Sequence, residues 1–180
     1  MLSYSSDSRG RESEITGVFL ETFTASEGEE EGALVAGLAE DLMRSTKPED
    51  LRVNLALDGG AIVGAIMFSR LWFEGDARRV FLLSPVAVLP ECQGQWVGTT
   101  LLTYGLGMLR AEGVDAVISY GDPAYYARVG FAPIRPEDVP PPMHLRMPEG
   151  WIGQSLTDAP LGRFTGPSRS VAALSRPRLW

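Results

Sequence analysis

The segment SPVAVLPECQGQWVGTTLL, residues 84–102, has the pattern of a strand that runs through a loop into a helix. The N-terminus of a helix exposes unpaired backbone N–H groups and the positive end of the helix dipole, which together bind phosphate. A loop that binds phosphate usually has glycine at its centre, because glycine lets the ligand approach the backbone closely. Here Trp96 occupies that position. The segment therefore raises the question of whether the chain binds a phosphorylated ligand.

The residues that follow predict a compact α/β unit. A helix is expected from about Trp96 to Arg110, and Gly113 just beyond it is a typical stop signal. VDAVISY, residues 114–120, follows as a buried strand. A strand, a helix and a strand with short links predict parallel strands in a right-handed βαβ unit. A short helix then begins, with Asp122 as its N-cap, Pro123 at its first position and Gly130 at its left-handed end.

Further elements flank this unit on both sides. Residues 13–26 have the apolar spacing of a helix, and a second helix is expected to begin at Ser26, which forms a capping-box pattern with Glu29. Residues 51–71 predict a β-hairpin that turns at residues 58–60. Residues 78–90 predict a central strand, in which Pro85 demands a local irregularity.

The C-terminal part of the chain carries weaker signals. Residues 132–150 are proline-rich and predict a loop, and residues 170–174 predict one more strand.

Composition narrows the class of protein. The 180 residues contain 44% hydrophobic and 22% charged side chains, which is typical of one soluble globular domain. The net charge is −7, and the sequence shows no basic patch of the kind that a nucleic-acid-binding protein needs. An acidic surface suits cationic partners such as amines. Cys92 is the single cysteine, so no internal disulfide forms. No apolar run approaches the length of a membrane span, and residues 1–14 lack the apolar stretch of a signal peptide, so we expect a cytoplasmic protein.

Two segments carry a resemblance to a known family. PVAVLPECQGQWVG, residues 85–98, and YYARVGFAPI, residues 125–134, resemble the GNAT superfamily of N-acetyltransferases. The resemblance covers roughly residues 50–135, and the two helices before it fit the family's topology. It implies an α/β fold with a mixed, twisted sheet, splayed central parallel strands and helices on both faces. We expect residues 1–180 to form a single domain of this kind.

The resemblance implies acetyl-CoA as the cosubstrate and no metal. The family's pyrophosphate loop reads Q/R-x-x-G-x-G/A, and here Gln93 and Gly98 match it. The residues implied to bind the cofactor are Val86, Ala87 and Val88 along the pantetheine arm, and Gln93, Gly94, Gln95, Trp96, Val97, Gly98 and Thr99 around the pyrophosphate. Trp96 replaces the first glycine of the motif. Its indole either points away, leaving the loop amides free, or fills the pyrophosphate groove and blocks the site.

The resemblance also implies a general acid. Tyr126 occupies the position of the family's frequent acid, five residues before Phe131, and a phenol there would protonate the departing thiolate of CoA. The competing interpretation is that Tyr126 packs in the core, as a pair with Tyr125. The general base is not identified from the sequence. The candidate strand itself has no carboxylate, only Ser84; Glu74 and Asp76 lie just before it, and Asp122 is expected to be a helix cap. His144 is a further candidate for the base, and Cys92 is a candidate nucleophile for which no histidine partner is placed.

Two functions from different classes remain open. The first is direct transfer of an acetyl group from acetyl-CoA to a primary amine of a small molecule or a peptide. The second is a non-catalytic sensor or interaction module with the same fold, which binds CoA weakly or not at all. No nucleic acid and no membrane are expected as partners, and a homodimer is one open alternative for the assembly.

Overall fold

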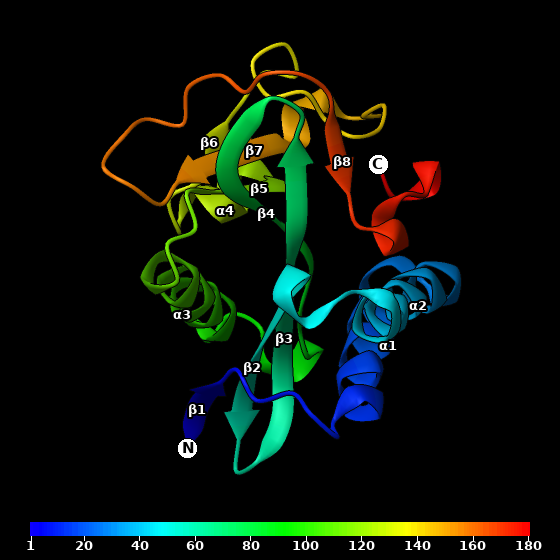
Figure 1. Ribbon diagram of the computed structural model, residues 1–180. Coiled ribbons are helices and arrows are strands. Elements are labelled where there is room, and N and C mark those ends of the chain that lie inside the picture. The colour runs from blue at the N-terminus through cyan, green and yellow to red at the C-terminus, as the bar shows by residue number, and fades with distance from the viewer. The chain divides into compact units, whose positions relative to one another are not determined.

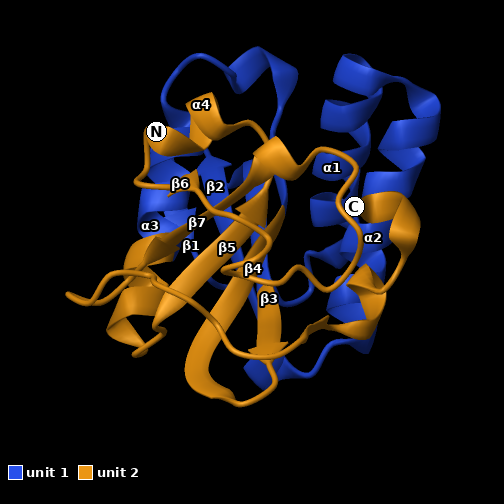
Figure 2. Ribbon diagram, turned by 90° about the horizontal axis from the view of Figure 1, so that it is seen from above, with its two compact units in different colours: residues 1–68, 85–105 blue, residues 69–84, 106–180 orange.

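The chain divides into two compact units, each made of two separate stretches (Figure 2). The computed structural model describes residues 1–180. Unit 1 comprises residues 1–68 and 85–105, and unit 2 comprises residues 69–84 and 106–180. Three elements run from one unit into the other: β3 (Ala61–Phe73), β4 (Asp76–Val88) and α3 (Val97–Ala111). The expectation of a single domain over residues 1–180 stays a prediction.

The sheet of unit 1 begins at the N-terminus of the chain. Strand β1 (Leu2–Ser5) pairs antiparallel with β2 (Leu51–Asp58), with Leu2 opposite Asp58. Strands β2 and β3 follow each other through the predicted turn, where Gly59 and Gly60 take positive φ values of 56° and 89°. The predicted hairpin is confirmed, whereas β1 was not predicted.

Helices cover both faces of the sheet in unit 1. Helices α1 (Glu12–Glu27) and α2 (Glu29–Ser45) lie side by side on one face, and α3 lies on the other (Figure 1). Their inner sides are apolar and buried, as the helical spacing predicts; the buried residues include Ile15, Val18, Phe19, Val35, Leu38 and Leu42. Gly32 permits the close approach of α1 and α2, because a Cβ on it would lie 2.0 Å from Thr24 Oγ1.

The predicted start of the second helix is wrong. Ser26 lies inside α1, which continues to Glu27. The break falls at Gly28, whose φ of 97° is easy only for glycine, and α2 begins at Glu29 without a side-chain cap. The capping-box pattern failed because the residues around Ser26 extend the first helix, and the glycine rather than the serine separates the two helices.

Unit 2 contains the parallel pair of strands. Strand β5 (Ala116–Tyr120) runs parallel to β4, from Val80 opposite Ala116 to Leu83 opposite Ser119. On its other side β5 pairs antiparallel with β7 (Trp151–Ser155), which pairs antiparallel with the short β6 (Ala132–Pro133).

The end of the chain adds one more strand to unit 2. Strand β8 (Ser168–Ser170) pairs antiparallel with Leu71–Phe73 of β3. The strand expected at residues 170–174 is therefore placed slightly too late, and a 3-10 turn occupies Ala172–Leu174. Strand β7 lies outside the predicted strands.

The predicted fold class is confirmed. The hydrogen-bonded strand order is β1-β2-β3-β4-β5-β7-β6, with β8 attached to β3, and parallel and antiparallel pairs occur in one sheet. The paired residues of β4 and β5 end at Leu83 and Ser119, whereas β4 continues to Val88. None of the helices is long and apolar enough to span a lipid bilayer.

Candidate active site

The loop between β4 and α3 has an unusual backbone. After a 3-10 turn at Pro90–Cys92, Gly94 takes φ 73° and Trp96 takes φ 65°, and α3 begins at Val97. Gln93, just before them, has a φ of −70°. Left-handed residues that alternate with residues of negative φ turn successive N–H groups toward one side, which forms an anion-binding nest.

The first turn of α3 supplies further N–H groups. The first hydrogen bond of the helical pattern runs from the Thr100 N–H to the Trp96 carbonyl oxygen, at 3.0 Å. The N–H groups of residues 97–99 therefore precede the helical ladder, as at the start of any α-helix. Together with the positive end of the dipole of a helix that extends to Ala111, they suit a pyrophosphate.

The side chains of the loop support its backbone. Gln93 Nε2 donates to the Val88 carbonyl oxygen at 2.9 Å, and Gln95 Nε2 donates to the Glu91 carbonyl oxygen at 3.0 Å. The Thr99 hydroxyl donates to the Trp96 carbonyl oxygen at 3.1 Å. These three side chains thus fix the shape of the loop, and its backbone N–H groups remain the natural contacts for an anion.

Trp96 is the only non-glycine residue with a positive φ. Its side chain is 73% exposed, so the indole gains little from packing. A bulky L-residue in the left-handed region costs on the order of 1–3 kcal/mol. The left-handed backbone explains why glycine is expected at this position. The backbone keeps that conformation even though the residue is tryptophan.

The alternation of strand β4 is broken once near its end. The Asp115 N–H donates to the Arg79 carbonyl oxygen at 2.9 Å, so odd-numbered residues in the first part of β4 face β5. At the far end the Leu89 N–H donates to the Val63 carbonyl oxygen of β3, also at 2.9 Å, so odd-numbered residues there face β3. If every second residue faced the same neighbouring strand, odd-numbered residues could not face β5 at one end and β3 at the other. The alternation therefore changes once between these ends, and Pro85, which has no N–H, lies in that interval.

The break in β4 changes which backbone groups reach the edge of the strand away from β3. The Ala87 carbonyl oxygen lies 3.3 Å from the position that a Cβ on Gly64 of β3 would take, so Ala87 faces β3. Val86 and Val88 accordingly face the opposite edge. The Val88 carbonyl oxygen already accepts hydrogen bonds from Gln93 and from the Thr22 hydroxyl, the latter at 3.3 Å.

Tyr126 lies in unit 2, on the short helix α4 (Pro123–Ala127). Its half-buried ring packs edge-on against Phe131 and Tyr125, with centroid distances of 5.7 and 5.1 Å. Burial, followed by the nearby Tyr125 and Asp122, raises the pKa of Tyr126 well above its ordinary value. Like an ordinary tyrosine, the phenol is protonated at neutral pH and can donate a proton, and its raised pKa makes it a weaker acid.

Several base candidates have other partners. Asp122 Oδ1 accepts the Ala124 N–H at 2.9 Å, so the predicted N-cap is confirmed. Asp76 binds the guanidinium of Arg78 at 2.8 Å, and this pairing holds the pKa of the Asp76 carboxyl below its ordinary value. Glu74 and His144 are exposed.

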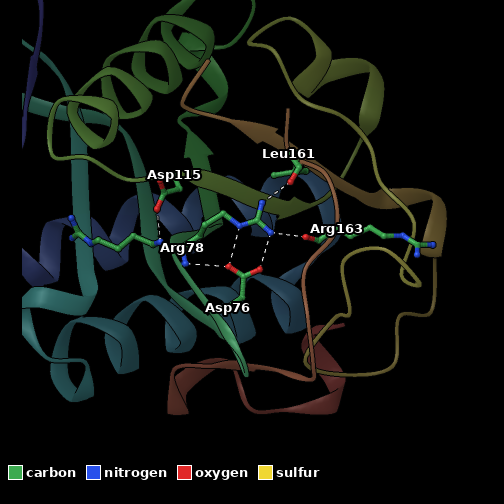
Figure 3. Close-up of polar contacts among 6 residues, drawn as sticks. Asp76, Arg78, Asp115, Leu161 and Arg163 are labelled. Atoms are coloured by element: carbon green, nitrogen blue, oxygen red, sulfur yellow. Dashed lines mark hydrogen bonds and ion pairs between the residues drawn. The ribbon is translucent and has the colours of Figure 1, made fainter. Parts of the chain in front are cut away.

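Figure 3 shows what Asp76 does instead. The guanidinium of Arg78 lies between the Asp76 carboxylate and two backbone carbonyl oxygens, those of Leu161 at 2.7 Å and Arg163 at 2.6 Å. The Arg78 side chain also lies 3.6 Å above the ring of Phe164. This network fastens the long C-terminal segment to the start of β4, so Asp76 has a structural role.

The Cys92 thiol, the candidate nucleophile, has a raised pKa. Burial, and then the carboxylates of Glu91 and Asp58, raise the pKa of the Cys92 thiol above its ordinary value. A thiol held in its neutral form is a poor nucleophile. No three His, Cys, Asp or Glu side chains lie close enough together to hold a metal ion.

Unit 2 contains a cavity that the sequence did not reveal. It has a volume of about 450 Å³ and lies at the carboxyl end of β5, beside the start of α4. Tyr120, Met147 and Glu149 contribute to its walls. Met147 and Glu149 lie in the segment predicted as a proline-rich loop, and only the fold brings that segment beside β5. The proximity follows from the pairing of β7 with β5, and β7 has no strong signal in the sequence.

The sequence profile of the Acetyltransferase (GNAT) family matches residues 13–131, which includes both the α3 entrance and Tyr126. The chain belongs to this family. The uncharacterized N-acetyltransferase YjhQ of Escherichia coli K12 is 38% identical over 136 residues, which cover 73% of each chain. The uncharacterized N-acetyltransferase YhbS of the same strain is 35% identical over 74 residues, which cover 41% of this chain and 44% of YhbS. The predicted resemblance and the predicted acetyltransferase class are thus confirmed.

Solved structures agree with the GNAT fold. A crystal structure of E. coli YhbS in complex with CoA has a TM-score of 0.79 at 23% identity and covers 98% of this chain and 92% of that one. A Brucella melitensis GNAT acetyltransferase in complex with acetyl-CoA has a TM-score of 0.69 at 23% identity, with 96% and 97% covered. At this level of identity the likeness establishes the fold.

The predicted site residues fall into both units. Val86–Val88 and Gln93–Thr99 belong to unit 1, where the Gln93 side chain joins the loop directly to the end of the strand. Tyr126 and the cavity belong to unit 2, where the Tyr126 ring packs against Gly121, a residue that also lines the cavity. The roles of all these residues stay predictions.

Proposed function

We propose that the chain transfers the acetyl group of acetyl-CoA to a primary amine. The observation that carries this proposal is the entrance to α3, where the alternating backbone at Gly94 and Trp96 and the first turn of the helix present N–H groups to an anion. Membership of the GNAT family supports it. So do the complexes of YhbS with CoA and of the Brucella protein with acetyl-CoA, since both share this fold.

In this proposal unit 1 binds the cosubstrate. The N–H groups of residues 94–99 bind the pyrophosphate, and the edge of β4 at Val86 and Val88 aligns the pantetheine arm by backbone hydrogen bonds. Because the Val88 carbonyl oxygen already accepts two hydrogen bonds, the backbone of Val86 is the better partner for that arm. A backbone N–H at this edge also polarises the thioester carbonyl and stabilises the oxyanion that forms during attack.

The chemical step joins nitrogen to carbon and releases sulfur. The neutral amine attacks the thioester carbon, the new C–N bond forms, and the C–S bond breaks as the thiolate of CoA leaves. The attacking nitrogen releases one proton to solvent water, and the thiolate takes one up. Tyr126, whose phenol is protonated at neutral pH like that of any tyrosine, is the donor that we assign to the thiolate.

A melting experiment tests cosubstrate binding. A ligand that binds only the native state adds RT ln(1 + [L]/Kd) to the free energy of unfolding, about 2.7 kcal/mol at 100 times Kd. We expect acetyl-CoA to raise the melting temperature, and pantetheine, which lacks the pyrophosphate, to have a much smaller effect. Consumption of acetyl-CoA is then followed with a panel of primary amines. The absence of a shift at millimolar acetyl-CoA would refute the proposal and favour the non-catalytic module, as would binding without turnover of any amine.

A further inference from the structure

The cavity of unit 2 is mainly apolar and has two acidic residues in its wall. Tyr120, Pro123 and Met147 are among the residues that line it, and so are Asp122 and Glu149. Its volume of about 450 Å³ lies within the range of pockets that hold small organic molecules. The combination suits a ligand that has both an apolar body and a positive charge.

The aromatic wall of the cavity is held in place before any ligand binds. The Met147 N–H donates to the Tyr120 hydroxyl at 2.7 Å. The Tyr120 ring stacks on Trp180 at a centroid distance of 6.2 Å and an interplanar angle of 19°, and Trp151 contacts it edge-on at 6.5 Å. A rigid wall loses little entropy when a ligand packs against it, which favours binding.

The charges around the cavity favour a cation. Asp122 uses one carboxylate oxygen for the Ala124 N–H, whereas Glu149 is exposed. The cationic neighbour Arg146 directs its guanidinium to the carbonyl oxygens of Pro177 and Arg178, at 3.4 and 2.6 Å. The acidic side chains of the cavity are thus not neutralised by this arginine, and the net charge of the whole chain, −7, acts in the same direction.

We propose that this cavity binds the acceptor, and that the acceptor is a small primary amine on an apolar skeleton. Its ring or alkyl chain packs against Tyr120, Pro123 and Met147. Its ammonium group lies beside Glu149, and this carboxylate makes the cavity prefer amines over neutral analogues. Gly121 connects this cavity to the proposed acid, because a Cβ at Gly121 would lie only 2.9 Å from the ring of Tyr126. The inference rests on the proposed function and names the substrate class for it.

Direct binding of unreacted amines tests the inference without turnover. We expect 2-phenylethylamine, tyramine or hexylamine to bind in calorimetric titrations, and 2-phenylethanol, which has the same body without the charge, to bind at least fivefold more weakly. Glu149→Gln keeps the size of the side chain and should weaken the amine about fivefold, as expected for one exposed ion pair of about 1 kcal/mol. Glu137→Gln is the matched control, since Glu137 is also exposed and does not line the cavity. In turnover, Glu149→Gln should raise the KM for the amine and leave kcat nearly unchanged.

Several results would overturn the assignment. They are failure of all three amines to bind at millimolar concentration, equal binding of the alcohol, and equal effects of Glu149→Gln and Glu137→Gln. Competition between 2-phenylethylamine and CoA would show that the cavity holds part of the cosubstrate instead. The melting shift caused by acetyl-CoA, measured on the same preparations, separates the two proposals. Amine binding without that shift would refute the proposed acetyltransferase activity and leave the assignment of the cavity standing. A shift without amine binding would refute the assignment of the cavity and leave cosubstrate binding standing.

Discussion

The junction from β4 into α3 and the junction from β5 into α4 meet the demands of the backbone in opposite ways. Where β5 leads into α4, Asp122 caps the Ala124 N–H, Pro123 starts the helix and Gly130 takes the left-handed φ of 98° beyond it. Where β4 leads into α3, Trp96 takes a left-handed φ of 65°. At that junction the loop side chains of Gln93 and Gln95 donate hydrogen bonds to carbonyl oxygens.

The difference supports the proposal that the α3 junction binds a ligand. At the start of α4 the Ala124 N–H is bound within the chain, because it donates to the Asp122 carboxylate. The loop before α3 instead has an alternating backbone, which costs strain at Trp96. Departures from local rules are expected at functional sites. We therefore propose anion binding at the α3 junction, alongside the proton transfer proposed for Tyr126 at the α4 junction, and three substitutions test that division.

The largest expected effect is that of Tyr126→Phe. If the phenol protonates the departing thiolate, its removal should lower kcat by about 100-fold and leave the affinity for acetyl-CoA unchanged. Phenylalanine keeps the ring contacts with Phe131 and Tyr125, so the fold should be preserved. Steady-state kinetics at saturating acetyl-CoA measure kcat, and calorimetry measures the affinity.

Tyr125→Phe is the matched control for this experiment. Tyr125 belongs to the same helix, its ring contacts that of Tyr126 at a centroid distance of 5.1 Å, and Arg128 lies 5.8 Å from its ring centroid. We expect it to change kcat much less. Equal, small effects of the two substitutions would mean that both tyrosines only pack, and the α4 junction would lose its chemical role.

The next largest effect concerns the cap of α4. Asp122→Ala removes the acceptor of the Ala124 N–H and should lower the free energy of unfolding by about 1 kcal/mol. Asp122→Asn retains a side-chain oxygen and should be nearly neutral. Denaturant unfolding measures both variants. An equal loss in the two would show that the charge of Asp122, rather than its hydrogen bond, stabilises the junction.

The sequence predicted those parts of the fold whose signals are local. Asp122, Pro123 and Gly130 lie at the two ends of α4 as expected, and the hairpin turn at Gly59 and Gly60 is also confirmed. The irregularity demanded by Pro85 is found, because the backbone pattern of β4 changes there. Each of these features depends on residues only a few positions apart.

Features that depend on distant contacts were missed. Strand β7 is defined by pairing with β5, and its Trp151 is buried with its indole N–H donating to the Val139 carbonyl oxygen at 2.8 Å. The neighbouring glycines and prolines hide this strand from a local pattern. The cavity of unit 2 was missed for the same reason. Glu149 and Tyr120 are far apart in the sequence, and both line the cavity because β7 pairs with β5.

The smallest expected effect belongs to Trp96, the residue that sets the two junctions apart. Glycine adopts φ 65° without strain, so Trp96→Gly should relieve part of the cost of the left-handed backbone. Glycine also loses about 0.5–1 kcal/mol more conformational entropy on folding, which leaves a net gain of roughly 0.5 kcal/mol in the free energy of unfolding. Because the indole is 73% exposed, little packing is lost. A gain here and none in Trp96→Ala, which keeps the strain, would confirm that the backbone is the cause.

The same pair of variants decides what the indole does to acetyl-CoA. We propose that it lies outside the path of the pyrophosphate, because its side chain is largely exposed while the loop keeps the φ pattern of a nest. The affinity should then stay unchanged or fall slightly in both variants when measured by isothermal titration. An affinity at least tenfold higher in both would show that the indole obstructs the groove, and the α3 junction would then be a closed site in the natural chain. Tighter binding by Trp96→Gly alone would instead assign the cost to the strained backbone, since alanine removes the indole and leaves φ where it was.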